Sequence, residues 1–536
     1  MNRIKYIFGA MTFFFLGISI AIFFYYENKD RIGYIDVRPG ESKIYVEDIG
    51  ISIKGWDNYG VTYFFIPSYA RISAVNYDRS ELGIYSLEGD LLEHPIFNTI
   101  QEVLVDTDDG GKAEYRVGFY QSDNLYTINL MMDKGDFGDI VREKYEPIDL
   151  DIVSPNGNIT SCEDTEIKGR GNYSWGNTHQ QSYEIRFSKP ISVSGLTKAR
   201  RYALIPNSTD QTKLCNKIAF DVSSLMGMEY TPEADWIDVY VNGIYHGNYL
   251  ICQEPDISKN KLNIGDLERD NEKFWDEGSG FDEDDIKGYE YSENPDDISG
   301  GYLIEADNSH ERRKCGFHLS SGVFFNIKSP DNASRAELNY IRTFINSVDN
   351  RLHYGDLPFE TIDKFSFARR YLIEEVMYNY DACYASYYFY KKRGDPILYA
   401  GPCWDYDASF INKEGSILEN DSVPVIGGKR LDWDRCLMEN CEYEEYVKKT
   451  FERYAEIWDR MLSFQIDKYY ERLSDSLDMQ YARWNHIEED SGMVSQSVEP
   501  EILKDELKMR LYTRLCYLAD KWDVDYEFTN PRQSTY

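Results

Sequence analysis

The sequence predicts an α+β protein in which an N-terminal membrane helix precedes a β-rich first half and a helix-rich second half. Three observations predict this class. An uncharged apolar run lies near the start, and short β-branched or aromatic runs separated by Gly, Asp, Asn and Ser follow it. Helical periodicity then dominates after Ser334. The length of 536 residues favours two or three domains.

The apolar run covers residues 6–26 and is long enough to cross a bilayer as a helix. Arg3 and Lys5 precede it, so the positive-inside bias favours a cytoplasmic N-terminus. No small-residue cleavage site or lipobox cysteine follows, which favours an uncleaved anchor over a signal peptide. We therefore expect residues 1–30 to be a membrane anchor. The protein would then be a single-pass membrane protein with the bulk of the chain extracytoplasmic.

Residues 31–148 are expected to form a small β-sandwich-like domain, because they contain strand-like runs and no long amphipathic helix. The clearest strands are Val61–Ile66, Tyr115–Tyr120 and Leu125–Met131. Modules of this kind usually support or bind, and none of these residues indicates catalysis.

The character of the sequence changes near residue 149. Strands are expected over Asp164–Trp175 and Ser182–Phe187, and a helix over Lys213–Leu225. A hairpin is expected to turn at Asn242-Gly243. Residues 255–300 are acidic and Gly-rich and are expected to be a mobile insertion. The expected later helices are Arg335–Val348, Lys364–Tyr380, Tyr443–Met461, Asp467–Trp484 and Pro500–Lys521.

Charge and motif content exclude several classes of function. The formal net charge of −35 repels phosphate backbones, so we expect no nucleic-acid partner. Such a surface would favour metal cations or basic substrates, although it also serves solubility alone. The nine cysteines include no C-x-x-C pair, which excludes a zinc ribbon or thioredoxin-type motif. Neither a G-x-S-x-G nor a Walker-type phosphate loop is present.

Three aspartates form the strongest candidate site. The helix expected to end near residue 380 leads into Asp381, and a hairpin over residues 387–400 returns the chain to Asp405 and Asp407. Three carboxylates so close would repel unless Mg²⁺ or Mn²⁺ neutralised them. Phosphoryl transfer uses this arrangement, with one Asp for the acceptor and another for the metal. Alternatively, the Trp-Asp-Tyr-Asp string is only a strand-end turn whose carboxylates cap backbone amides.

Five strings then occur in an order that resembles the CotH (spore coat protein H-type) kinase family over roughly residues 145–525. They are Gly169–Trp175 (GRGNYSW), Ala203–Asn207 (ALIPN), Val241–Tyr249 (VNGIYHGNY), Gly300–Glu305 (GGYLIE) and Trp404–Asp407 (WDYD). Each string alone is modest, but five in the right order are specific.

The resemblance implies an atypical, two-lobed protein-kinase-like domain over residues 149–525, with 526–536 as a tail. It also implies ATP and Mg²⁺ or Mn²⁺ as cofactors. The expected activity is transfer of the ATP γ-phosphate to Ser or Thr of exported or surface proteins.

The resemblance also assigns roles to residues of this chain. Asp381 would be the catalytic aspartate, Asp405 a metal ligand and Asp407 a second one. Arg170 would reach toward the phosphates or stabilise the cleft. Glu254 would lie near the hinge that borders the adenine pocket.

The chain departs from the family pattern at several positions. Gln180 and Gln181 stand where the family often has basic residues, which leaves Arg186 and Lys189 as the nearest substitutes. Arg186 is therefore included among the expected nucleotide-binding residues. Ser386 stands where some relatives carry Asn.

Two alternatives remain open on the sequence. The kinase-like part could be an inactive surface scaffold or assembly protein. It could also keep the ATP site and transfer AMP or an amino acid, because a fold constrains the reaction only loosely.

Overall fold

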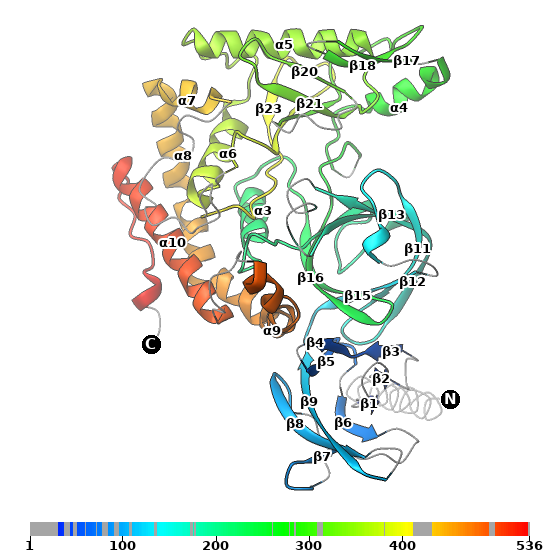
Figure 1. Cartoon of the computed structure of the whole chain (residues 1–536). Helices are drawn as coiled ribbons and strands as arrows, with labels where there is room; N and C mark the ends of the chain where they lie inside the picture. Colours follow the sequence, from blue (N-terminus) through cyan, green and yellow to red (C-terminus); the bar gives the residue numbers. More distant parts are fainter. Residues whose placement is uncertain are drawn as a thin grey trace, which may run out of the picture.

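The computed structural model describes residues 31–36, 43–46, 51–58, 60–70, 72–77, 84–90, 96–106, 110–132, 137–171, 175, 178, 180–259, 261–277, 279–283, 286–307, 315–379, 381–410, 431–491 and 499–533. These residues form a mixed α+β structure, in agreement with the predicted class. Figure 1 shows a strand-rich side and a side made of helices, with a further sheet joining the two.

Two sheets come first along the chain. One is ordered β3-β2-β1-β6 and the other β4-β5-β9-β8-β7. Their strands are β1 Arg31–Asp36, β2 Lys43–Val46, β3 Ile51–Lys54, β4 Trp56–Asn58, β5 Val61–Ile66, β6 Ile72–Tyr77, β7 Ile84–Ser86, β8 Thr99–Asp106 and β9 Lys112–Gln121. β5 is buried along its whole length, which explains its continuous aromatic and β-branched sequence.

A closed barrel of seven strands follows, in the order β10-β11-β12-β13-β14-β16-β15. The strands are β10 Tyr126–Met131, β11 Glu146–Val153, β12 Ile159–Arg170, β13 Ser182–Ile191, β14 Ala199–Ile205, β15 Ala234–Val241 and β16 Ile244–Cys252. Parallel pairing of β10 with β15 closes it. β15 and β16 form the hairpin predicted at Asn242-Gly243. The barrel includes residues on both sides of residue 148. β10 and the start of β11 come before it, and the other strands come after it.

Strand alternation divides the side chains of the barrel between its two faces. Ile167 and Ile185 belong to an apolar cluster with residues of the other barrel strands. Lys168 and Glu184 pair across β12 and β13 on the opposite face, with 3.1 Å between nitrogen and oxygen. This outer, charged face carries one part of the candidate site.

A seven-stranded sheet, ordered β17-β18-β20-β21-β19-β22-β23, lies beneath helix α5 in Figure 1. Its strands are β17 Ser279–Asp282, β18 Ile286–Glu290, β19 Tyr302–Ala306, β20 Gly316–His318, β21 Phe324–Ser329, β22 Tyr387–Lys391 and β23 Leu398–Ala400. β22 and β23 form the predicted second hairpin. The acidic stretch expected to be a mobile insertion contains strands β17 and β18, helix α4 Leu267–Asn271 and the 3-10 turn η3 Glu272–Glu277.

Helices make up the rest of the second half. They are α3 Cys215–Leu225, α5 Arg335–His353, α6 Lys364–Met377, α7 Trp433–Met438, α8 Cys441–Arg460, α9 Ile466–Ser491 and α10 Pro500–Lys521. A π-helical segment, η4 Met461–Gln465, joins α8 to α9. The turns η2 Phe137–Asp139 and η5 Pro531–Gln533 complete the set.

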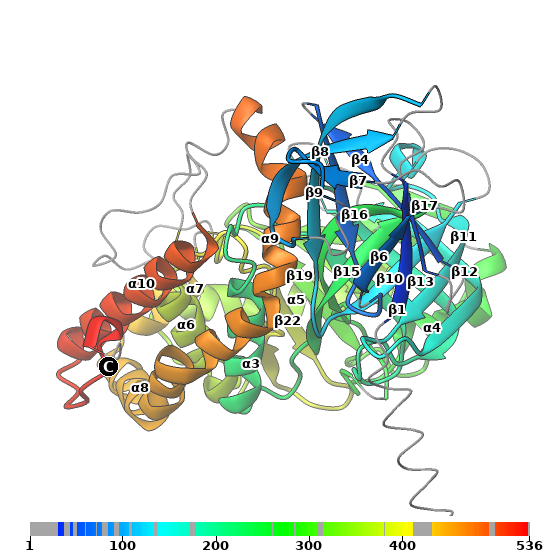
Figure 2. The same ribbon diagram turned by 90° about the horizontal axis from the view of Figure 1, so that it is seen from below.

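Helix α9 ties the two halves together, since it packs against barrel strand β16 and against β9. Figure 2 shows it running between the strands and helices α6, α8 and α10. The Asn248 side chain donates to the Ser476 hydroxyl at 2.9 Å, and its backbone N–H donates to Gln480 at 2.8 Å. The helical half is therefore fixed to the barrel by buried hydrogen bonds.

The predicted membrane anchor requires correction. Among the residues that the structure describes, no helix combines the length and the apolar character needed to span a bilayer. The expected span over residues 6–26 lies outside the described residues. The transmembrane part of the predicted fold class and the predicted single-pass localisation are therefore not retained.

Candidate active site

The candidate site is built where two loops meet. One loop follows α6 and carries Asp381, and the other follows β23 and carries Asp405 and Asp407. The buried Asn379 side chain links them. Its amide nitrogen donates to the Asp405 carbonyl at 3.4 Å, and its oxygen accepts from the Asp381 backbone N–H at 3.3 Å. The returning hairpin thus brings the two predicted segments together.

A buried carboxylate stabilises the place where the two loops meet. Glu374, on α6, accepts a hydrogen bond from Asn379 at 2.9 Å and one from the Tyr406 hydroxyl at 2.8 Å. Burial raises the pKa of Glu374 to about 7, although these two hydrogen bonds act to lower it. The Tyr406 backbone N–H donates to Asn216 of α3 at 2.8 Å. Elements α3 and α6 therefore both hold the Trp-Asp-Tyr-Asp string in place.

Left-handed backbone conformations gather around the two loops. Tyr378, Cys383, Ser386, Asp405 and Phe410 all have φ between 46° and 69°. Such residues are uncommon outside glycine, and they persist only where the surroundings determine them. The Ser386 hydroxyl donates to Asp405 Oδ2 at 2.8 Å. The serine that stands where some relatives carry Asn thus contacts the predicted metal ligand.

The two carboxylates of the Trp-Asp-Tyr-Asp string lie side by side. Burial and then the neighbouring Asp405 raise the pKa of Asp407 well above its ordinary value. A hard divalent cation would relieve the repulsion between the two carboxylates. Among the described residues, Asp381 does not join them in a group whose ligand atoms all lie within 4.8 Å. The residues fit a cation held by Asp405 and Asp407, with Asp381 on the adjoining loop.

The outer face of the barrel supplies charge to this site. Arg170, the last residue of β12, pairs with Glu254 beyond β16, at 2.7 Å from Nε to Oε1. Its guanidinium lies 5.5 Å from the centre of the Trp404 ring. Burial would lower the pKa of Arg170, but Glu254 first and Asp405 more weakly raise it above its ordinary value. Arg170 and Glu254 therefore belong to the same site as Asp405.

The pKa of Glu254 reflects the positive charges that surround it. Burial would raise it, but Arg170 first and then Lys328 hold it at about 2. Lys328 lies on β21, in the other half of the molecule. The ion pair is therefore fully charged at any physiological pH.

Arg186 occupies a different place. It pairs with Glu166 on the neighbouring strand and lies 3.9 Å from the centre of the Tyr145 ring. Its side chain is 43% exposed. These contacts lie further along the outer face of the barrel than Arg170, so the structure does not bring Arg186 together with the other predicted residues.

The two glutamines that interrupt the family's basic pattern have structural contacts. The Gln180 amide donates to the Asn248 carbonyl at 3.0 Å, and its oxygen accepts from Gln480 of α9 at 2.8 Å. Gln181 donates to the Trp175 carbonyl at 3.3 Å. They fix the barrel to its surroundings.

Sequence reasoning missed several residues of the site. Glu374 and Asn379 were read only as helix, although a buried Glu at the end of an apolar helix is a usable signal. Lys328 acts on the pKa of Glu254, and Glu254 acts on the pKa of Tyr388, so both residues lie near Glu254. They reach it by sheet pairing between distant strands, for which the sequence gives no local signal. Lys168 was detectable, because it lies two residues before Arg170 and so on the same strand face.

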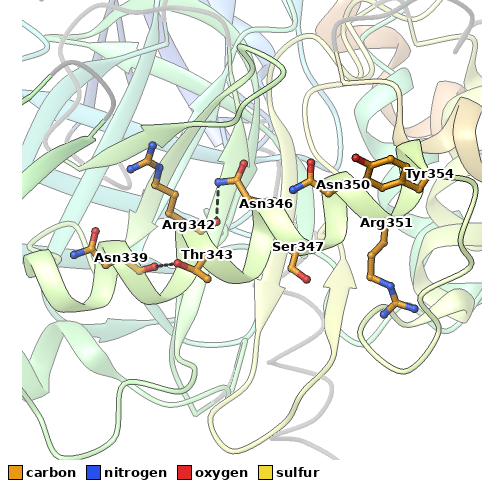
Figure 3. A pocket seen from close by; sticks show the side chains of 8 residues that line it. All are labelled: Asn339, Arg342, Thr343, Asn346, Ser347, Asn350, Arg351 and Tyr354. Atoms are coloured by element: carbon orange, nitrogen blue, oxygen red, sulfur yellow. Dashed lines mark hydrogen bonds between the residues drawn. The ribbon is translucent and has the colours of Figure 1, made fainter.

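A hollow of about 570 Å³ lies elsewhere, on the outer face of α5. Figure 3 shows its lining, which comes from α5 and from Tyr354 directly after it: Asn339, Arg342, Thr343, Asn346, Ser347, Asn350, Arg351 and Tyr354. No second element contributes a facing group, and Tyr354 is 87% exposed. Its shape and chemistry do not make it part of the acidic site.

The structure therefore defines a mixed α+β protein with paired carboxylates beside an arginine–glutamate ion pair. Comparison with protein families identifies it further: residues 167–513 match the family described as CotH kinase protein. Since this match covers more than half of the chain, the protein belongs to the CotH kinase family. No curated protein matches the chain significantly. The family membership confirms the resemblance carried by the five sequence strings.

Proposed function

We propose that this protein is an ATP- and divalent-metal-dependent phosphotransferase that transfers the γ-phosphate to Ser or Thr hydroxyls of protein substrates. Membership in a kinase family supports the reaction class. The observation that carries the proposal is the Asp405–Asp407 pair beside the loop of Asp381, in which burial and the neighbouring Asp405 raise the pKa of Asp407. A bound Mg²⁺ or Mn²⁺ ion would neutralise negative charge on the nucleotide phosphates.

In this proposal each residue has a distinct role. Asp405 and Asp407 hold the cation, and the Ser386 hydroxyl and the Asn379 amide fix the orientation of Asp405. Asp381 accepts or orients the proton of the acceptor hydroxyl. The permanently charged Arg170 lies against Trp404 and brings positive charge toward the phosphates.

The test is phosphate transfer by the purified full-length chain, measured with γ-labelled ATP and a Ser/Thr-containing acceptor in the presence of Mg²⁺ or Mn²⁺. Asp381→Asn should lower the rate by about 100-fold or more, because a positioned general base contributes at least that much. Asp405→Asn should abolish the metal-dependent transfer of phosphate. Asp520→Asn, a change of the same kind at an exposed position of α10, serves as the control and should leave the rate unchanged.

Intact-mass measurement of the acceptor separates the proposal from its alternatives. Addition of one phosphoryl group supports it, whereas addition of AMP or an amino acid would mean that the same site transfers another group. Full transfer by Asp381→Asn would contradict the role given to Asp381. Absence of any nucleotide binding by the wild-type chain would favour a scaffold role instead.

A further inference from the structure

A second group of possible ligands lies away from the acidic site, at the junction of α5 and α7. His353 is the last residue of α5, Asp432 immediately precedes α7, and Cys436 lies on α7. One ligand atom from each of the three lies within 4.8 Å of the other two. Bonds from zinc to N, O and S of about 2.0–2.3 Å set adjacent ligands at most about 4.6 Å apart. Small side-chain rotations therefore suffice for all three to bind one ion.

The hydrogen bonds of His353 leave its second nitrogen directed at a carboxylate. Nδ1 lies 2.8 Å from the Asp349 carbonyl oxygen, which can only accept, so Nδ1 carries a proton. Nε2 lies 3.0 Å from Asp432 Oδ1. Two acceptors cannot face each other at this distance, so a second proton or a metal ion must lie between them. Donation from Nδ1 to a carbonyl is the arrangement that orients a metal-binding histidine.

The Asp432 side chain does not cap the helix that it precedes. It occupies the N-cap position of α7, where aspartate usually accepts from the first backbone N–H groups, but its side chain makes no capping hydrogen bond. Its carboxylate faces His353 through Oδ1 and Arg435 through Oδ2. Arg435 also lies 3.8 Å from Cys436 Sγ. Burial and then Asp432 raise the pKa of the Cys436 thiol to about 11, so an ion must displace its proton.

We propose that His353, Asp432 and Cys436 bind a zinc-like transition-metal ion that fastens the end of α5 to the start of α7. The set of N, O and S donors suits such an ion and not Mg²⁺, which prefers oxygen alone. Three protein ligands leave a fourth position for water. The junction is coupled to the loop of Asp381, because the Leu431 N–H donates to the Cys383 carbonyl at 3.3 Å. Its ligands are not those proposed for the cation at Asp405 and Asp407, so it would be a second, separate ion.

Titration of the chelator-treated full-length protein with Co²⁺, followed by its absorption spectrum, tests this site. We expect one Co²⁺ per chain to give the near-ultraviolet band of a cobalt–thiolate bond, and Zn²⁺ but not excess Mg²⁺ to displace it. Cys436→Ala should lose the band and weaken binding by more than about 100-fold, beyond the 10–100-fold typical of outer partners. Cys441→Ala is the matched control, because Cys441 is an exposed cysteine at the start of α8. It should keep both band and affinity.

Thermal melts guard against a loss of binding through misfolding. With chelator present, Cys436→Ala and the wild type should melt at similar temperatures, and Zn²⁺ should raise the melting temperature of the wild type alone. Asp432→Asn provides a second variant if Cys436→Ala fails to fold. An unchanged cobalt spectrum and affinity in Cys436→Ala, or the absence of a thiolate band in the wild type, would overturn the site. These readouts do not involve phosphate transfer, so they stand apart from the proposed activity.

Discussion

Asp405 and Asp407 lower the stability of the fold at the place where they are proposed to hold a cation. The raised pKa of Asp407 means that the folded chain binds the proton of this carboxyl group more tightly than the unfolded chain does. The pair therefore destabilises the fold increasingly as the pH rises above the ordinary pKa of an aspartate. A cation would remove this cost only when bound.

Replacing Asp405 by Asn should separate the two effects. An amide can still accept from Ser386 and can donate to Asp407, so the repulsion disappears and the hydrogen bonds remain. We expect Asp405→Asn to unfold at higher denaturant in chelator at pH 8, by about 1–2 kcal/mol, while losing metal-dependent activity. Equilibrium denaturation measures this. Lower stability of the variant under these conditions would show that the pair is not repulsive.

Glu374 gives a prediction of pH dependence. Its pKa is about 7 in the folded chain against 4.5 for an ordinary Glu, so folding takes up a proton between these values. This contribution to stability is complete below about pH 4.5 and is lost as the pH rises to about 7. As the pH rises from 5 to 8, the unfolding free energy of Glu374→Gln should therefore increase relative to that of the wild type, by at most about 3 kcal/mol. Urea denaturation at both pH values measures the shift.

An exposed glutamate of α10 provides the matched control for this experiment. Glu501→Gln should show the same difference from wild type at pH 5 and pH 8. If the difference between Glu374→Gln and wild type were also independent of pH, the carboxyl group of Glu374 would not titrate in this range.

At the level of secondary-structure elements, Gly247 decides how closely α9 approaches the barrel. A Cβ at this position would lie 2.3 Å from Gln180 Nε2 and 2.7 Å from Gln480 Oε1, and φ is +130°. Both glutamines are fixed by hydrogen bonds, so neither can yield cheaply. We expect Gly247→Ala to cost about 2–4 kcal/mol of unfolding free energy, measured by chemical denaturation.

The control for Gly247 isolates backbone strain from the close contact. Gly195 has φ +79° and open space around it, so Gly195→Ala should cost only about 1 kcal/mol. Equal losses for the two variants would mean that the contact between strand and helix contributes nothing.

The elements that the sequence predicted well are those with local signals. The hairpin at Asn242-Gly243 and the helix over residues 500–521 carry their own turn or periodicity. The helix expected to reach Tyr380 ends instead at Met377, because Tyr378 takes a left-handed conformation that no sequence pattern indicates. Closure of the barrel was not predicted, since β10 pairs with β15 across more than a hundred residues.

The same distinction applies to the site. The hairpin return that joins Asp381 to Asp405 could be read from the chain, and Asn379 now shows the contact. Arg186 was placed near the nucleotide by analogy, whereas its strand register pairs it with Glu166. Register between strands depends on packing over the whole barrel, so residue spacing alone could not decide it.

At the scale of the whole molecule, the last long helix stabilises the helix that precedes the loop of Asp381. Arg514 of α10 and Glu375 of α6 form an ion pair in which both side chains are at most 1% exposed. Arg514 also donates to the Glu375 carbonyl at 2.6 Å. We expect Arg514→Met to cost about 3–5 kcal/mol, because it leaves a buried carboxylate without its partner. Chemical denaturation measures the loss, and adding Glu375→Gln should recover part of it.

The parallel pairing of β10 with β15 also has a consequence for biosynthesis. A ribosome must extend the chain to about residue 241 before residues 126–130 can find their partner strand. Until then, a half-made sheet has an exposed edge, which favours contact with chaperones or neighbouring nascent chains. Since Arg514 holds α6 through Glu375, the loop of Asp381 gains this support only near the end of translation.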